Sequence, residues 1–168
     1  MEKEYVKENY KEAVFRCSQL LAERNLTIAF AESATAGKLA YEFSLTPYSG
    51  KILKGGIVCY NACVKEDMLG ISSEIMSTYT PESAEVTREI CYAIQHKMPA
   101  EVSVAITGLT TPGGSESPLK PVGTMFFCIG YNNILNEQQI LLEGNPPDIV
   151  NKSIAAISDA ICSLVTSS

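Results

Sequence analysis

A hydroxyl and the start of a helix coincide in the first segment of this sequence that could do chemistry. Ser33 and Thr35 lie in the stretch Ala-Glu-Ser-Ala-Thr-Ala-Gly, residues 31–37, between an apolar run and a segment of helical spacing. A hydroxyl there meets unpaired backbone N–H groups and the positive end of a helix dipole, which can stabilise an oxyanion. Taken alone, however, the segment favours a simpler role, in which one hydroxyl only caps the helix.

The second segment supplies an amine and a phenol, in the order Tyr60-Asn-Ala-Cys-Val-Lys65. A lysine whose pKa is lowered by burial can act as the general base for a serine, and a tyrosine can relay or orient the proton. A serine and a lysine can therefore act as nucleophile and base without a histidine. The alternative for Lys65 is a solvated surface position, which is the commonest environment of this residue type.

The third segment is a loop, residues 108–121, which contains three glycines and three prolines and so cannot form regular structure. Its glycines would let backbone amides approach an anion, and Thr107 and Lys120 could add a hydroxyl and a positive charge. Loops of this length in compact domains usually have a function. A turn whose glycines serve only backbone geometry explains the segment equally well, so the loop alone is a weak signal.

Two other kinds of site are excluded by residue identity. Gly37-Lys38 follows an apolar run, as in a P-loop, but Glu32 replaces the first glycine and Leu39 the hydroxyl that holds magnesium. We therefore reject an ATPase. The only histidine, His96, has no metal-ligand spacing around it, so we expect no metal site. The six cysteines lie in apolar periodic segments and are interpreted as buried thiols.

Hydrophobic periodicity predicts the elements that carry these segments. Apolar runs rich in β-formers predict strands at residues 26–31, 55–60, 102–107, 122–131 and 138–142. Helical spacing predicts helices at residues 3–24, 35–43, 62–68, 83–98 and 148–165. We expect Ser83 to be an N-cap, residues 72–81 to form a connecting loop and Asn132-Asn133 to form a polar turn.

The alternation of strands and helices predicts an α/β fold with three layers, α/β/α, around a sheet of about five or six strands. The sheet is expected to be largely parallel or mixed, with the last strand pair as the candidate for an antiparallel pairing. Ligands gather at the carboxyl ends of strands in such sheets, and Ser33, Tyr60 and Thr107 all fall there. We therefore expect the three segments to converge on one site.

Length and charge limit the class of protein. The 168 residues fit one domain, residues 1–168, and no linker or repeat divides them. A formal net charge of −6 argues against nucleic acid as a partner, because binding to a phosphate backbone needs a basic face. The sequence shows neither an apolar signal region nor a run of about 20 apolar residues. We therefore expect a cytoplasmic protein that does not bind membranes.

Together, the three segments resemble the C-terminal domain of the CinA family. Members of that family share the stretches A-E-S-C-T-G-G, Y-S-N-x-x-K and T-G-I-A-G-P-x-G-G...K-P-V-G in that order. The similarity covers residues 27–124 and, more faintly, the final helix. It implies the α/β fold of the family and, for active members, hydrolysis of nicotinamide mononucleotide to nicotinate mononucleotide and ammonia.

The resemblance also implies roles for individual residues. Ser33 would be the nucleophile that forms an acyl-enzyme, Lys65 its base and Tyr60 an assisting hydroxyl. The partner would be a small-molecule nucleotide substrate, with no cofactor and no metal, and a homo-oligomer is expected. The implied substrate-binding residues are Glu32, Thr35, Thr107, Gly108, Gly113, Gly114 and Lys120.

Several positions depart from the family pattern. Ala34 replaces the cysteine of the first stretch, Ala36 its first glycine, and Thr110-Thr111 stand where Ala-Gly is usual. The G-D-R segment before the last helix of the family reads Gly-Asn145-Pro146 here, so an arginine suited to phosphate is missing. This departure leaves the identity of the substrate open.

Two alternatives to a nicotinamide mononucleotide amidohydrolase remain at this point. One is a catalytically idle domain of the same fold that binds a nucleotide or a protein. The other is a hydrolase of another small amide, which would keep the Ser33 and Lys65 pair but lack the phosphate grip. An active enzyme and an idle domain differ in whether Lys65 is buried next to Ser33 with a lowered pKa.

Overall fold

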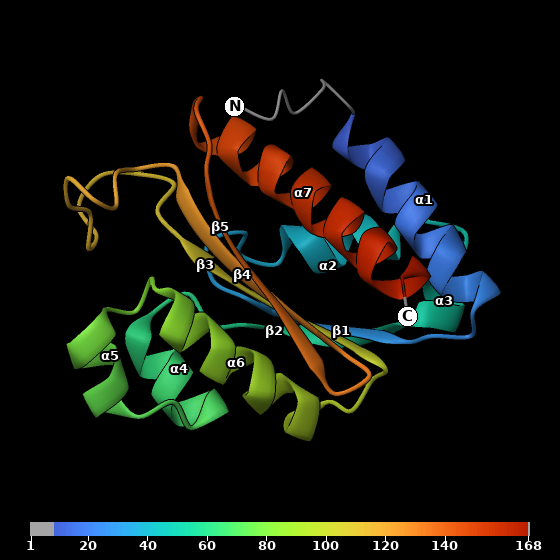
Figure 1. Ribbon diagram of the computed structural model, residues 1–168, viewed down its shortest axis with the longest axis horizontal. Helices are drawn as coiled ribbons and strands as arrows, with labels where there is room; N and C mark the ends of the chain where they lie inside the picture. Colours follow the sequence, from blue (N-terminus) through green and yellow to red (C-terminus); the bar gives the residue numbers. More distant parts are fainter. Residues whose placement is uncertain (1–8, 168) are drawn as a thin grey trace.

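Five strands form one mixed sheet in the computed structural model, which describes residues 9–167 (Figure 1). Their order across the sheet is β2-β1-β3-β4-β5. The central strands β1 and β3 are almost wholly buried and pair in parallel, as expected for near-continuous apolar runs. The bounds are β1 Ile28–Glu32, β2 Leu53–Val58, β3 Val102–Gly108, β4 Thr124–Tyr131 and β5 Ile134–Leu141.

The antiparallel part of the sheet is larger than the sequence predicted. Strand β2 is parallel to β1, but β4 is antiparallel to both β3 and β5. The turn between β4 and β5 is Asn132-Asn133, and both residues have positive φ, 50° and 60°. Asparagine tolerates this backbone region, which the twist of a two-residue hairpin requires. The predicted mixed sheet and the predicted turn are therefore confirmed.

Helices cover both faces of the sheet, which confirms the three-layer α/β/α architecture. Figure 1 shows α1 (Tyr10–Glu23) and α7 (Pro146–Thr166) side by side over one face. The short helices α2 (Lys38–Ser44) and α3 (Ser49–Ile52) complete this layer. The other face packs against α4 (Ala62–Leu69), α5 (Ser73–Tyr79) and α6 (Ala84–Lys97).

Strand β1 shows how alternation builds the two cores. Ile28 and Phe30 pack into the core beneath α1 and α7, whereas Ala29 and Ala31 belong to the core beneath α6. Successive side chains point to opposite faces of a strand, so one strand serves both layers. The carboxyl end of β1 is therefore held between the two helical layers.

Two short helices were not anticipated, α3 and α5. Residues 72–81 were expected to be a loop, but α5 lies there because the Ser72 hydroxyl accepts a hydrogen bond from the Glu74 N–H and Met76 is buried. Helix α6 begins after Ser83, whose hydroxyl accepts from the Val86 N–H at 3.2 Å, as predicted. The part of the first predicted helix before residue 9 lies outside the described residues.

Helix α7 corrects the expectation that no segment is long and apolar enough to span a bilayer. By length and composition it is the one helix among residues 9–167 that passes this test. It is also amphipathic, and Ile154, Ile157 and Ile161 pack into the core against the sheet. A packed core helix passes the same test, so this observation is weak evidence for a membrane.

Four of the six cysteines are buried, as predicted: Cys17, Cys59, Cys91 and Cys128. Cys63 is exposed on α4 and Cys162 is half-buried on α7. The buried thiols are small apolar groups within the two core layers.

Candidate active site

The start of helix α2 is held by a buried carboxylate at the end of β1. Glu32 Oε2 accepts hydrogen bonds from Thr35 Oγ1 at 2.5 Å, Gly37 N at 3.1 Å and Leu39 N at 3.0 Å. Its Oε1 accepts from Ala40 N at 2.7 Å. A carboxylate at this place satisfies the orphan N–H groups of a helix start and complements the helix dipole.

Glu32 and Thr35 were both expected to bind substrate, and the structure gives them another task. Glu32 is 1% exposed, and its four hydrogen bonds all go to protein groups of the turn and of α2. Thr35 is buried as the donor to that carboxylate. The structure therefore assigns both side chains to the shape of the turn.

We expect Glu32→Gln to lower the free energy of unfolding by about 2–4 kcal/mol, because the amide group of glutamine offers one acceptor oxygen where the carboxylate uses two. The change leaves at least one buried donor at the start of α2 unsatisfied. Urea unfolding followed by circular dichroism measures the loss. The exposed Glu66→Gln is the control and should change stability by less than about 0.5 kcal/mol; equal stability of both variants would contradict this role.

Because Glu32 caps the helix, the Ser33 hydroxyl is not needed as a cap. The N-cap residue of α2 is Gly37, whose side chain makes no capping bond. The Ser33 N–H donates to Ile106 O on β3 at 3.0 Å, which ties the turn to the central strand. The turn closes through Ala36 and Gly37 with φ of 49° and 93°. The alternative in which Ser33 only caps a helix is therefore wrong.

Lys65 lies directly against Ser33. Asn61 is the N-cap of helix α4, and its side-chain oxygen accepts from the Cys63 N–H at 3.0 Å; Lys65 follows one turn later. Its side chain is fully buried, and its Nζ is 3.2 Å from Ser33 Oγ. The surface alternative for Lys65 is excluded, and the predicted contact between the two side chains is confirmed.

Two backbone carbonyls complete the surroundings of the Lys65 amine. Nζ donates to Cys59 O at 2.9 Å and to Tyr60 O at 3.3 Å. Nζ also donates to Ser33 Oγ, so a protonated Lys65 can give one N–H to each of the three oxygens. A neutral amine keeps its two N–H bonds on the carbonyls and turns its lone pair to the Ser33 hydroxyl, so the same geometry lets a neutral Lys65 accept the Ser33 proton.

The environment favours this neutral form. Burial lowers the pKa of Lys65 below its usual range, because removing an ammonium group from water is costly. The nearby Cys59 and Glu82 side chains oppose part of this shift. A general base needs a pKa near the working pH, so the direction of the shift is the one that catalysis requires.

A cavity of about 220 Å³ opens in front of Ser33. Its walls are Ser33 and Ala34 from the turn, Tyr60, Glu82 and the loop of residues 108–114. Gly108, Gly113 and Gly114 thus line the cavity, as the resemblance implied. All these segments meet at the carboxyl ends of β1, β2 and β3, where ligands of open α/β sheets bind.

Tyr60 contributes differently from what the sequence suggested, and Ala34 offers a backbone group that the sequence analysis did not identify. The Tyr60 side chain is 60% exposed at the cavity, and the contact with Lys65 comes from its backbone carbonyl rather than from its hydroxyl. Ala34 is nearly buried, and within residues 9–167 its N–H donates to no protein acceptor. Ala34 lines the cavity, and an N–H next to the nucleophile without a protein acceptor is a candidate donor to an oxyanion.

Thr107 and Lys120 lie away from the cavity. Thr107 is fully buried and bonds to Thr87 of α6, with 2.8 Å between the two hydroxyl oxygens. The Lys120 ammonium donates to Thr80 Oγ1, Glu82 O and Ser115 Oγ at 2.6, 2.8 and 2.7 Å. These three bonds use all its protons, so Lys120 fastens the loop to the segment before α6.

Glu82 lines the cavity and was missed by the sequence analysis. It precedes the N-cap Ser83, and helix α6 begins at the same end of the sheet at which β1 and β3 finish. A signal for it did exist, because a residue just before a helix that leads into a parallel strand falls at the ligand-binding edge. Only the packing of α6, however, decides which way its side chain lies.

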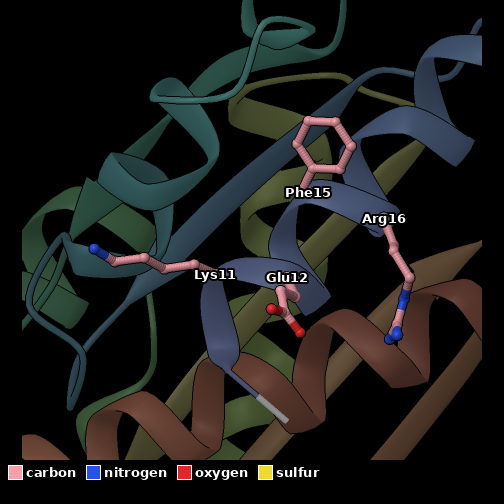
Figure 2. Close-up of a pocket in the computed structure, with 4 residues that line it drawn as sticks. All are labelled: Lys11, Glu12, Phe15 and Arg16. Carbon is pink, nitrogen blue, oxygen red and sulfur yellow. The ribbon is translucent and has the colours of Figure 1, made fainter.

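A second, shallow hollow lies on the outer face of α1 and shares no residue with this cavity (Figure 2). It is lined by Lys11, Glu12, Phe15 and Arg16, and Arg16 pairs with Asp159 of α7 at 3.0 Å. Its charges are mixed, and no nucleophile lies among them. The described part of the chain also contains no group of three His, Cys, Asp or Glu side chains placed to hold a metal ion.

A family model described as the CinA C-terminal domain matches residues 11–165 of this chain. A CinA-like protein of Prochlorococcus marinus strain NATL1A is 37% identical over 123 residues, which cover 73% of this chain and 27% of the relative. A CinA-like protein of Mycobacterium marinum is 36% identical over 137 residues, covering 81% and 32%. This chain therefore spans about a third or less of the length of these curated relatives.

Solved structures show the same fold. A CinA superfamily protein from Klebsiella pneumoniae superposes with a TM-score of 0.86 at 23% identity, over 92% of this chain and 96% of that one. A CinA superfamily protein from Enterobacter cloacae gives a TM-score of 0.83 at 27% identity, over 99% and 98%. With the family model and the sequence relatives, these matches establish that the chain belongs to the CinA family and corresponds to its C-terminal domain.

Proposed function

We propose that this domain is an amidohydrolase that cleaves a small carboxamide with Ser33 as nucleophile and Lys65 as base. The observation that carries the proposal is the 3.2 Å contact between Ser33 Oγ and a fully buried Lys65 Nζ at the floor of the cavity. Burying a lysine without a carboxylate partner is unfavourable for folding, so such a residue marks a functional site. An idle binding domain would have no need of it.

In the first half of the reaction, Ser33 Oγ attacks the carbonyl carbon of the amide while its proton passes to Lys65 Nζ. The carbonyl oxygen becomes an oxyanion, which the Ala34 N–H stabilises. The C–N bond then breaks, and the same proton moves from Lys65 to the departing nitrogen, which leaves as ammonia. The product of this half is an ester between Ser33 and the acyl group.

In the second half, water replaces ammonia. Lys65 accepts a proton from the water as its oxygen attacks the ester carbonyl, and the proton returns to Ser33 Oγ when the ester bond breaks. The sum is amide plus water giving carboxylic acid plus ammonia. The carbonyls of Cys59 and Tyr60 keep the amine in place throughout, so one base serves both halves.

Nicotinamide mononucleotide is the first substrate to test, because the resemblance to the CinA C-terminal domain implies its deamidation. The experiment incubates the purified protein with this nucleotide and with a panel of other carboxamides, and measures released ammonia. We expect ammonia from at least one of them at a rate that depends on Ser33. Binding of these compounds without any ammonia release would overturn the amidohydrolase and favour the idle domain.

A second candidate, a hydrolase of a different small amide, is favoured by the surroundings of the cavity. Among residues 9–167 no cation lines it, because the Lys120 ammonium bonds to Thr80, Glu82 and Ser115 and Lys65 lies buried beneath Ser33. At the position of the family arginine, Pro146 is the first residue of α7, and Asn145 caps the helix by accepting from the Asp148 N–H at 2.9 Å. This helix start offers an acidic side chain instead of a guanidinium group.

Pro146→Arg is expected to tighten binding of nicotinamide mononucleotide about tenfold to a hundredfold, because arginine forms charge-assisted bonds to phosphate. The backbone bonds from Leu142 N to Gly123 O and from Gly123 N to Leu109 O connect the segment before α7 to the cavity wall. Calorimetry in a Ser33→Ala background measures the affinity. Pro147→Arg is the matched control; tight binding by the unmodified protein, with no gain in Pro146→Arg, would contradict this prediction.

A further inference from the structure

We propose that strand β5 pairs antiparallel with β5 of a second copy of this chain, which joins the two sheets into one continuous sheet. Strand β5 lies at one edge of the sheet, and among residues 9–167 it pairs only with β4. None of its residues lines the cavity at Ser33, so this inference does not depend on the proposed function.

The outer side of β5 carries unpaired backbone groups. The Leu142 N–H donates to Gly123 O of the β4 side at 3.0 Å, and the ladder between β4 and β5 continues from there without a shift in register. Successive residues of an antiparallel strand direct their N–H and C=O groups to opposite sides, so the even-numbered residues of β5 face β4. The residues whose backbone groups point away from the sheet are Leu135, Glu137, Gln139 and Leu141.

The two edges of the sheet differ in how they are protected. At the other edge, the register of β2 with β1 shifts so that Lys54 is left out of the ladder, and two glycines follow it. Irregular edges and edge lysines prevent a further strand from pairing. Strand β5 has no proline, glycine or lysine, and its end residues Ile134 and Leu141 are 51% and 62% exposed. It is therefore the edge that is open to another strand.

The sequence of β5 fits a second copy of itself. In a two-fold interface, residue i of one copy contacts residue j of the other and j contacts i. Hydrogen-bonded pairs of an antiparallel ladder join residues whose backbone groups both point across the gap, so odd-numbered residues must oppose odd-numbered ones. Only the register centred on Gln138 pairs all four outward residues with one another. It sets Leu135 opposite Leu141 and Glu137 opposite Gln139 of the second copy.

The charge on β5 favours the same register. Glu137 Oε1 accepts a hydrogen bond from Arg88 Nε of α6 at 2.8 Å, which holds the carboxylate on the α6 face of the sheet. The amide of Gln139 of the second copy can donate to the other oxygen of this carboxylate. A register centred on Glu137 would instead set two carboxylates directly opposite each other, which is destabilising. The leucine pairs at both ends of the ladder bury apolar surface.

Sedimentation velocity of the unmodified protein over a range of concentrations tests whether the second copy binds. We expect the mass to rise from 18.2 kDa to twice that value. The dissociation constant should be about 1–100 μM, because a single strand edge is a small interface. A protein that stays monomeric up to about 500 μM overturns the inference.

Charge substitutions at Gln139 test the register. Gln139→Lys places an ammonium opposite Glu137 twice in each dimer and should tighten the dimer about tenfold, whereas Gln139→Glu opposes carboxylates and should weaken it about tenfold. Ser44→Lys and Ser44→Glu are the matched controls, because Ser44 is exposed on α2, which packs beside β2 at the opposite edge. Both controls should change the dissociation constant less than about threefold. An equal response of the two Gln139 variants overturns the inference.

Amide hydrogen exchange locates the interface without any substitution. The N–H groups of Glu137 and Gln139 should exchange about tenfold more slowly in a solution that is mostly dimeric than in one that is mostly monomeric. The N–H groups of Asn136 and Gln138 face β4 and should be protected in both solutions. A dimer in which Glu137 and Gln139 exchange as fast as in the monomer uses another surface, and this result also overturns the inference.

Discussion

Ser33→Ala is expected to abolish acyl-enzyme formation and to lower the rate of ammonia release by about a thousandfold or more. Alanine removes the hydroxyl that lies in the cavity and against the Lys65 amine. Steady-state release of ammonia, measured with the best substrate of the panel, gives the size of the loss.

The control for this variant is Thr110→Ala, which removes a hydroxyl from the cavity wall that has no contact with Lys65. Its rate should stay within about tenfold of the unmodified protein, because such a residue affects binding more than chemistry. Unfolding midpoints should match in both variants and in the unmodified protein. A Ser33→Ala protein that releases ammonia as fast as the Thr110→Ala protein would rule out Ser33 as nucleophile.

Lys65→Arg is expected to be nearly as damaging as loss of Ser33, with a rate about a thousandfold lower. A guanidinium group stays protonated near neutral pH and cannot accept the proton of Ser33. Lys65→Met gives the same loss while filling the buried space with an uncharged chain of similar length. Lys54→Arg, on the exposed side of β2, is the control and should keep full activity; activity in either Lys65 variant near that level would contradict the assignment.

The pH dependence supplies a second readout for Lys65. Since the neutral amine is the active form, kcat/KM should rise with pH through the lowered pKa of Lys65 and then level off. In the folded protein this pKa lies below the value of the unfolded chain, about 10.4. The unfolded chain therefore binds more protons between the two values.

Stability should follow the same titration, because extra protons on the unfolded chain make the free energy of unfolding increase with pH. In the unmodified protein this free energy should rise between the lowered pKa of Lys65 and about pH 10. Lys65→Met should lack this part of the rise, which urea unfolding at several pH values would show. A rise of equal size in both proteins would mean that Lys65 is charged when folded.

The fold could be predicted from sequence where local chemistry decides it. Ser83 has the side chain of an N-cap, and Asn132-Asn133 has the residues of a two-residue hairpin, so both were identified correctly. Helix α5 was not, because its seven residues bury only Met76 and give almost no periodic signal. The direction of β4 was also open, since an apolar strand reads the same in either direction.

The candidate site, too, could be predicted only in part from the sequence. The approach of Ser33 to Lys65 followed from placing both segments at the carboxyl edge of a parallel sheet, as the family motifs implied. The roles of Glu32 and Lys120 did not follow, because each is defined by partners that only the folded turn or loop supplies. Glu82 was overlooked for the same reason, since its importance lies in facing a cavity made by other segments.

The most direct test of the account is mass spectrometry of the protein after an acid quench within the first turnover. With the carboxamide that releases ammonia fastest, we expect an adduct equal in mass to the acyl group on the peptide that contains Ser33. The adduct should be absent from Ser33→Ala and should disappear from the unmodified protein as substrate is exhausted. Ammonia release at full rate with no adduct, or with an adduct on another residue such as Cys59, would contradict nucleophilic catalysis by Ser33.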